Sequence, residues 1–237
     1  MGGVGYLLLA TLAVVVLGLL VVRLYREIFF FEGIRLGDRL HTALYDRWAG
    51  SYDAGKRDVQ KNDARTLVEP LLARLERSGA NTPDALLLDA ATGTGRLPAA
   101  LLGDPRFTGR VVGLDASLGM LRKAGARLAR FGGRSVLLHQ PAAPLPFPDG
   151  SFDAVSCLES VELFPDRDAH FREFLRVLRP GGVLLLSRRR DEWGRAGRVC
   201  PPERFAEQLR AAGFEGVEIG PWWVHYDLVW AGKPEAR

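Results

Sequence analysis

The apolar positions of the chain follow three patterns in three successive regions. Residues 1–22 contain no charged side chain and are almost wholly apolar, whereas residues 23–44 mix arginines with aromatic and aliphatic side chains. From residue 45 to residue 237, short apolar runs alternate with longer stretches in which apolar residues recur every three or four positions. We therefore predict an apolar N-terminal helix (1–22), a connecting segment (23–44) and one folded domain (45–237).

The uncharged run at residues 1–22 is long enough to cross a membrane as a helix. Twenty helical residues span about 30 Å, which is the thickness of the hydrocarbon layer. A secretory signal peptide usually has a basic start and ends at a small-residue cleavage site. This run starts uncharged and continues into "VVRLYREIFFF". The pattern favours a transmembrane anchor over a cleaved signal peptide or a buried core helix.

The basic residues near this run all lie after it, at Arg23, Arg26, Arg35 and Arg39. The positive-inside rule then predicts a single-pass membrane protein with its amino terminus outside and its domain in the cytoplasm. The phenylalanines and aliphatic residues among these arginines suit a juxtamembrane segment that lies in the lipid headgroup layer. They suit a first domain helix packed on the core equally well, so both interpretations of residues 23–44 stay open.

The domain pattern predicts an α/β fold. Nearly continuous apolar runs predict strands buried on both faces at 85–89, 110–115, 135–139, 152–157 and 182–187, with two further strands at 216–220 and 226–232. Amphipathic stretches predict helices at 63–77, 96–102, 117–131, 170–178 and 201–214. Such alternation is typical of a doubly wound, mostly parallel sheet of seven strands with helices on both faces.

The loop "DAATGTGR" after the first strand has the form of a ligand-binding turn. A P-loop needs Lys and Ser or Thr after its last glycine, and a dinucleotide loop needs a third glycine, but Gly95 is followed by Arg-Leu-Pro. Asp89 before the loop would oppose a pyrophosphate and suits a cationic ligand. Asp115, at the end of the next strand, is placed to bind ribose hydroxyls. A cationic group and a ribose without phosphate describe S-adenosylmethionine.

Five motifs in order then carry a family resemblance. They are "YDRWAGSYD", "LLLDAATGTGR", "VVGLDASLGML", "LPFPDGSFDAV" and "FLRVLRPGGVLLLS". With them, the chain from about Tyr45 onward resembles class I S-adenosylmethionine-dependent methyltransferases, and within these the ubiquinone/menaquinone C-methyltransferase-like group with a methyltransferase type 11 domain. The resemblance implies a Rossmann-like fold and S-adenosylmethionine as cofactor.

The resemblance also implies residue roles. Asp89 would hold the amino group of the cofactor, Asp115 its ribose, and the backbone from Ala91 to Gly95 its methionine part. The full set of cofactor-binding residues implied in this way is Asp89, Ala91, Thr92, Gly93, Gly95, Asp115, Ala116, Met120, Pro141, Ala142 and Leu158. Two of them depart from the family pattern: Ala91 replaces a glycine, and Pro141 stands where an aspartate often accepts a hydrogen bond from adenine.

Methyl transfer from a sulfonium needs alignment and exclusion of water, and it needs a base only when the acceptor arrives protonated. The candidate catalytic residues are Glu159 and Glu162, after the fourth strand, and Tyr52, which is also a candidate lid residue. Family members often have histidines in the region where this chain has "VELF". Glu162 has an alternative interpretation as a solvated residue at a helix start. Arg188–Arg190 are predicted in a solvated loop, with contact to anionic headgroups or to an acidic substrate as the alternative.

Composition adds limits to this picture. The net charge of +4 is small and scattered, which gives no nucleic-acid footprint, and two cysteines are too few for a zinc site or a disulfide framework. We therefore predict a membrane-anchored methyltransferase without a metal, acting on a small or lipid-like acceptor such as a quinone precursor, a phospholipid amine or a thiol. The alternative is a non-catalytic cofactor-binding or scaffolding protein.

Overall fold

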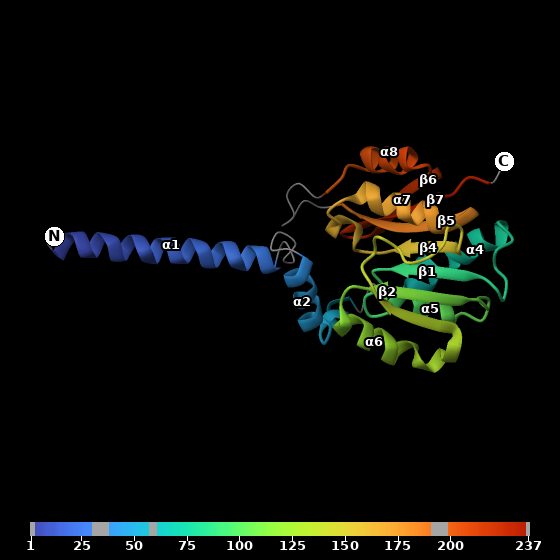
Figure 1. Cartoon of the computed structure of the whole chain (residues 1–237), viewed down its shortest axis with the longest axis horizontal. Helices are drawn as coiled ribbons and strands as arrows, with labels where there is room; N and C mark the ends of the chain where they lie inside the picture. Colours follow the sequence, from blue (N-terminus) through green and yellow to red (C-terminus); the bar gives the residue numbers. More distant parts are fainter. Residues whose placement is uncertain (1–2, 30–37, 57–60, 191–198, 236–237) are drawn as a thin grey trace.

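The computed structural model describes residues 3–29, 38–56, 61–190 and 199–235 (Figure 1). Its helices are α1 (Gly3–Phe29), α2 (Asp38–Trp48), α4 (Glu69–Arg77), α5 (Arg96–Gly103), α6 (Leu118–Leu128), α7 (Arg167–Val177) and α8 (Pro202–Ala212). Short helical segments are η2 (Tyr52–Lys56), η3 (Ala64–Val68), η4 (Ala129–Arg134) and η5 (Val161–Leu163). The strands are β1 (Leu86–Ala90), β2 (Arg110–Asp115), β3 (Ser135–His139), β4 (Phe152–Cys157), β5 (Leu178–Arg189), β6 (Glu215–Trp223) and β7 (Tyr226–Gly232).

The seven strands form one sheet in the order β3-β2-β1-β4-β5-β7-β6. The pairs among β1 to β5 are all parallel, whereas β7 is antiparallel to both β5 and β6. The predicted seven-stranded α/β sheet is therefore confirmed as a mixed sheet. The strand order reverses between β1 and β4, and in open α/β sheets ligands bind beyond the strand ends at such a switch point.

Helices cover both faces of the sheet because successive strand residues point to opposite sides (Figure 1). In β1, Leu87 packs in a cluster with residues of η3, α4 and α5, while Leu88 packs in a second cluster with residues of α7 and α8. Cys157 lies fully buried in the second cluster, and burial raises the pKa of its thiol well above the ordinary value. The two clusters hold the strands rigidly, so the strand ends are fixed relative to one another.

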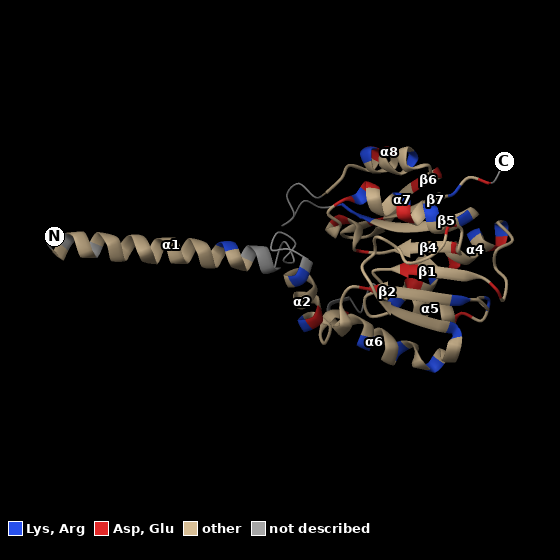
Figure 2. Cartoon of the chain, in the orientation of Figure 1, with Lys and Arg blue, Asp and Glu red and all other residues tan. Residues whose placement is uncertain are grey.

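The helix α1 is long and apolar enough to cross a membrane by length and composition. Its segment from Leu8 to Tyr25 has a mean hydropathy of 2.5, and none of it is buried against the rest of the chain. A signal sequence would have the same properties. Figure 1 shows α1 extending away from the domain, and Figure 2 shows it uncharged as far as Arg23.

The predicted domain boundaries stay a prediction. The helix α1 continues past residue 22 to Phe29, and α2 runs across the expected start of the domain at residue 45. Residues 30–37 of the predicted juxtamembrane segment lie outside the described residues.

Candidate functional site

A cavity opens where β1, β2 and β4 end, at the switch point of the sheet. The space between its lining atoms is about 600 Å³, including its open mouth. Its lining residues come from the ends of these strands, from the loops and first helical turns that follow them, and from the segment before η3. They are Tyr45, Tyr52, Asp53, Asp89, Ala91, Thr92, Gly93, Thr94, Arg96, Leu97, Asp115, Met120, Leu158, Glu159 and Ser160.

Asp89 lies at the bottom of this cavity on β1 and is 4% exposed. Its carboxylate accepts hydrogen bonds from the hydroxyls of Thr92 and Ser156, both at 2.6 Å. Burial raises the pKa of Asp89 to about 6, although the two hydroxyl donors act in the opposite direction. A buried carboxylate with this pKa is charged at neutral pH and is strongly stabilised by a cation placed beside it.

Asp115 ends β2 and faces the same cavity. Its two oxygens accept hydrogen bonds from the backbone N–H groups of Gly93 and Ser117, each at 2.8 Å. Burial raises the pKa of Asp115, while these two backbone donors lower it. The contact with Gly93 ties the end of β2 to the loop after β1, so the two carboxylates lie on a common frame.

The loop after β1 has a left-handed backbone at three of its residues. The φ angles are +54° at Ala91, +55° at Gly93 and +73° at Gly95. Ala91 is therefore strained, because a side chain in this region costs about 1–2 kcal/mol. At Gly95, a Cβ atom would lie 3.1 Å from the Cβ of Ala124, so the glycine also allows the loop to approach α6 closely.

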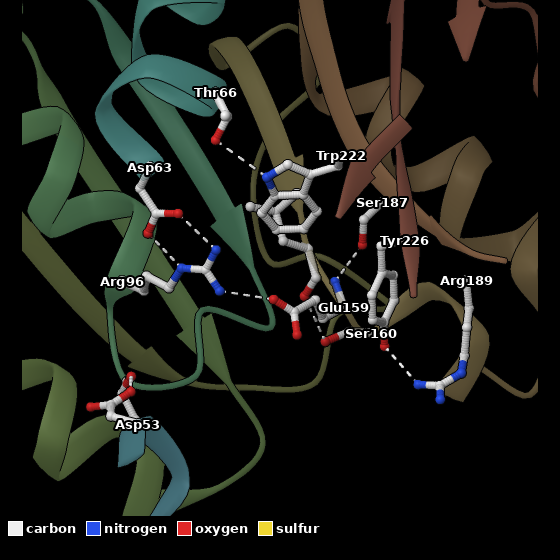
Figure 3. A network of polar contacts seen from close by, with 12 residues as sticks. Asp53, Asp63, Thr66, Arg96, Glu159, Ser160, Ser187, Arg189, Trp222 and Tyr226 are labelled. Carbon is white, nitrogen blue, oxygen red and sulfur yellow. Dashed lines mark hydrogen bonds and ion pairs between the residues drawn. The ribbon is translucent and has the colours of Figure 1, made fainter. Parts of the chain in front are cut away.

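The fourth strand brings Glu159 to the rim of the cavity in a second strained conformation, with φ at +56°. Its backbone N–H donates to the Ser187 hydroxyl at 2.6 Å, and its Oε1 accepts from Arg96 Nη1 at 2.9 Å (Figure 3). Arg96 also binds both carboxylate oxygens of Asp63, at 2.5 and 2.8 Å. From the sequence, Arg96 served only to exclude a P-loop and a dinucleotide-binding loop, and Asp63 was not identified as a site residue.

The segment before η3 closes one side of the cavity. Tyr45 of α2 and Tyr52 of η2 line it, with their ring centroids 6.1 Å apart. Burial raises the pKa of the Tyr45 hydroxyl well above its usual range, and the nearby groups Tyr52, Tyr226, Glu162 and Asp115 add to that shift. Tyr52 was predicted at this place, whereas Tyr45 was missed although it stands in the same "YDRWAGSYD" motif.

Two aspartates fix this segment to the rim. Asp46 of α2 accepts from the Ser117 hydroxyl at 2.5 Å and from the Gly119 N–H at 2.7 Å, at the start of α6. Asp53 accepts from the Thr94 hydroxyl at 2.7 Å and from Arg127 at 2.5 Å. None of these contacts of Asp46 and Asp53 was predicted, because each joins residues that are far apart in the sequence.

The structure brings together nine of the predicted site residues in the cavity wall: Tyr52, Asp89, Ala91, Thr92, Gly93, Asp115, Met120, Leu158 and Glu159. Five predicted residues lie outside that wall. Gly95 supports the loop, Ala116 pairs through its carbonyl with His139 at 2.8 Å, Pro141 is exposed and Ala142 is packed in the core. The fifth, Glu162, is buried at 6% exposure and accepts a hydrogen bond from the Tyr226 hydroxyl at 2.5 Å.

Two expectations about charged residues are wrong. Glu162 is not a solvated helix-start residue, because Tyr226 of β7 covers it. Arg188 is not in a solvated loop: β5 extends to Arg189, where it pairs with β7, and Arg188 forms a buried ion pair with Asp227 of that strand. Both corrections come from β7, which reaches these residues across the sheet.

Comparisons with known proteins find methyltransferases among the proteins that this chain resembles. Residues 88–186 match the family model described as "Methyltransferase domain". The chain is 36% identical over 163 residues to a nocamycin O-methyltransferase of Saccharothrix syringae, covering 67% of this chain and 51% of that protein. It is 35% identical over 144 residues to the ubiquinone/menaquinone biosynthesis C-methyltransferase UbiE of Syntrophotalea carbinolica, covering 60% of this chain and 58% of that protein. The chain thus spans between half and three fifths of these relatives.

Solved structures show the same fold at lower identity. Phosphoethanolamine N-methyltransferase 2 of Haemonchus contortus, in complex with S-adenosyl-L-methionine, superposes with a TM-score of 0.59 at 19% identity, covering 70% of this chain and 53% of that one. The cyclase SpnF superposes with a TM-score of 0.61 at 24% identity, covering 71% and 82%. Residues 88–186 of this chain thus match a methyltransferase domain, and the fold around them is shared with S-adenosylmethionine-dependent methyltransferases.

Proposed function

We propose that this protein is a methyltransferase anchored in a membrane by α1, with its domain in the cytoplasm and a small or lipid-like molecule as methyl acceptor. The observation that carries the proposal is the cavity at the ends of β1, β2 and β4. It combines two buried carboxylates, Asp89 and Asp115, with a loop whose left-handed residues keep its backbone close to a ligand. S-adenosylmethionine supplies an activated methyl group on a sulfonium when it is bound there.

The residues of the cavity fit this cofactor. Asp89 offers a buried negative charge to the cationic end, and Asp115 keeps lone pairs for ribose hydroxyls beside the two backbone donors it already binds. Met120 supplies an apolar side chain to the wall near Asp115, where an adenine ring would pack. Pro141 has no side-chain acceptor to offer to adenine, and it is exposed and lies outside the cavity wall.

The chain's own contribution to methyl transfer is alignment and exclusion of water. Tyr45 and Tyr52 wall the cavity on the side of α2, and Leu158 and Glu159 form its edge beyond β4. Glu159 would accept a proton from a protonated acceptor at its carboxylate, which Arg96 holds at the rim. Glu162 is less suited to direct contact, because Tyr226 lies against it outside the cavity wall.

The position of the cavity supports an acceptor that resides in the membrane. The helix α2 lines the cavity through Tyr45 and follows the apolar helix α1 after only eight intervening residues. Relatives named for quinone biosynthesis and a fold neighbour named for phosphoethanolamine indicate small acceptors of these kinds. Quinone precursors, phospholipid amines and membrane thiols are the three classes we propose.

The test is transfer of a labelled methyl group by the full chain in bilayer nanodiscs. The probes are a demethylated quinone, phosphatidylethanolamine and an alkyl thiol, each offered with S-adenosylmethionine labelled in its methyl group. We expect label in one probe, and loss of that transfer in Asp115→Ala. Binding of the cofactor without transfer to any probe or to a total lipid extract would instead favour the non-catalytic alternative.

A further inference from the structure

A buried triad of two acids and one arginine lies at the cavity, with two of its members in the cavity wall (Figure 3). Arg96 lies between Asp63 and Glu159, with N···O distances of 2.5 Å to Asp63 and 2.9 Å to Glu159. The exposed fractions of the three side chains are 5% for Asp63, 14% for Arg96 and 7% for Glu159. Ion pairs this well buried are little screened by solvent or salt, so their charges act on whatever occupies the cavity.

The three residues stand at different depths from the cavity. Arg96 and Glu159 line it, whereas Asp63 lies behind Arg96 and is not among the lining residues. Arg96 uses Nε and Nη2 for Asp63 and Nη1 for Glu159, and the ring of Trp222 lies 5.2 Å from the guanidinium carbon. These contacts hold Arg96 in one orientation, so Asp63 controls the charge that the wall presents without touching a ligand.

The charges of the triad sum to minus one when both acids are ionised; burial raises the pKa of Asp63, and its hydrogen bonds to Arg96 oppose that shift. Burial lowers the pKa of Arg96, but its hydrogen bonds and its proximity to Asp63 and Glu159 outweigh that effect and raise it, so the guanidinium stays charged. With Glu159 alone, Arg96 would give a neutral pair. Asp63 therefore supplies the excess negative charge, which a cation in the cavity feels at low effective dielectric.

We propose that the Asp63–Arg96–Glu159 triad determines the preference of the cavity for the cationic methyl donor over the neutral product. This inference rests on the proposed function, since it takes S-adenosylmethionine as the ligand. In methyl transfer the carbon–sulfur bond breaks, its electron pair stays on sulfur, and a lone pair of the acceptor forms the new bond to carbon. The sulfonium thus becomes the neutral thioether of S-adenosylhomocysteine, and the excess negative charge no longer holds it.

The measurement is the ratio of dissociation constants for S-adenosylhomocysteine and S-adenosylmethionine, by calorimetry on the full chain in detergent. Asp63→Asn makes the triad neutral and should weaken donor binding about tenfold more than product binding. The double variant Asp63→Asn/Arg96→Gln restores the net charge of minus one and should bring the ratio back toward that of the unmodified chain. A purely structural role would instead make the double variant worse and change both affinities alike.

Asp153→Asn is the matched control, because Asp153 is also a buried acid paired with an arginine, Arg179, but lies at the amino end of β4. It should leave the ratio unchanged. A ratio that Asp63→Asn does not alter, with both ligands bound, overturns the inference and leaves the proposed function standing. Failure of the unmodified chain to bind either ligand overturns both.

A second measurement needs no variant and applies if Asp63→Asn does not fold. Sinefungin carries an ammonium group in place of the methylated sulfur, so the unmodified chain should bind it about tenfold more tightly than S-adenosylhomocysteine. Equal affinities for these two ligands would contradict a net negative wall and overturn the inference.

Discussion

At the scale of single residues, the cavity contains groups held in unfavourable states by the fold around them. Asp89 is a carboxylate almost removed from water, and Ala91 and Glu159 are side-chain-bearing residues with positive φ. Such features cluster at functional sites because the surrounding structure, and then the ligand, makes up for their free-energy cost. Asp89 and Ala91 each give a substitution that should stabilise the free protein.

Asp89→Asn should stabilise the free protein and weaken cofactor binding. An acid whose pKa rises from 3.8 to about 6 on folding makes stability fall as the pH rises from about 4 to about 6, because the folded state binds more protons in that range. Removing the charge should raise the free energy of unfolding by up to about 3 kcal/mol at pH 7.5 and about half as much at pH 5. Chemical denaturation at both pH values measures this. An equal loss of stability at both would show that the hydrogen bonds from Thr92 and Ser156 matter more.

Ala91→Gly should raise the free energy of unfolding by about 0.5–1 kcal/mol. Glycine removes the left-handed strain of about 1–2 kcal/mol at φ +54°. It also raises the entropy of the unfolded chain, which offsets part of this gain in stability. Ala91→Val should destabilise by more than 1 kcal/mol, since a β-branched residue fits this region worst. Thermal unfolding of the two variants side by side gives the answer, and a lower melting temperature for the glycine variant would disprove the strain.

At the scale of elements, the junction between α2 and α6 links the N-terminal part of the chain to the cofactor cavity. Asp46 caps the start of α6, and the hydrogen bonds from Ser117 and Gly119 lower its pKa against the opposing effect of burial. A Cβ atom at Gly119 would lie 2.8 Å from both Cα and the carbonyl oxygen of Asp46. Only glycine therefore permits α2 to lie this close to α6.

Gly119→Ala should separate α2 from α6 and open the Tyr45 side of the cavity. We expect S-adenosylmethionine affinity to fall at least about threefold, with the domain still folded because neither core cluster includes α2. Gly125→Ala on the same helix is the control: its nearest contact would be Leu137 at 3.8 Å, an ordinary distance, and alanine favours the helix by about 1 kcal/mol. Equal cofactor affinities in the two variants would show that the position of α2 does not affect cofactor binding.

The elements themselves follow from the local sequence where an apolar run is bounded by turn residues. The bounds of β2, β3, β4 and β7 are those expected, and Asp89 and Asp115 meet because parallel strands end at one edge. The expected β5 was too short at its carboxyl end because Arg188 and Arg189 pair with Asp227 and Tyr226 of β7.

The ion pairs that hold the cavity wall could not be predicted either, because they also join residues that are far apart in the sequence. Arg96 contacts Asp63 over 33 positions and Glu159 over 63 positions. No local pattern marks such pairs, and an arginine or aspartate in a polar stretch looks solvated until its partner is known. The loop motif, by contrast, is local, and it located the cavity.

At the scale of the whole molecule, the cavity is lined by a residue of α2, the helix that follows α1 in the sequence. The eight residues between α1 and α2 can span at most about 30 Å, and α2 lies against the start of α6 beside the cavity. A membrane crossed by α1 would then pass close to the cavity mouth. This arrangement would give a lipid-dissolved acceptor a short path to the methyl group.

The full chain should stay in membranes washed with alkaline carbonate. Leu12→Arg/Val16→Arg places two charges in the middle of α1 and should release the protein, because each costs about 2.5–3.5 kcal/mol at the centre of a bilayer. Tyr25→Arg, near the end of the apolar segment, should not release it. A soluble protein whose mass lacks the first residues would show a cleaved signal sequence instead.

Binding of S-adenosylmethionine to the full chain, titrated by calorimetry with Asp115→Ala alongside, tests the central claim most directly. We expect saturable binding at one site, weakened by about tenfold or more in the variant, because the substitution removes the carboxylate that joins Gly93 to the end of β2 and that we propose binds the ribose. A folded chain that binds no S-adenosylmethionine at millimolar concentration would contradict the assignment of this cavity.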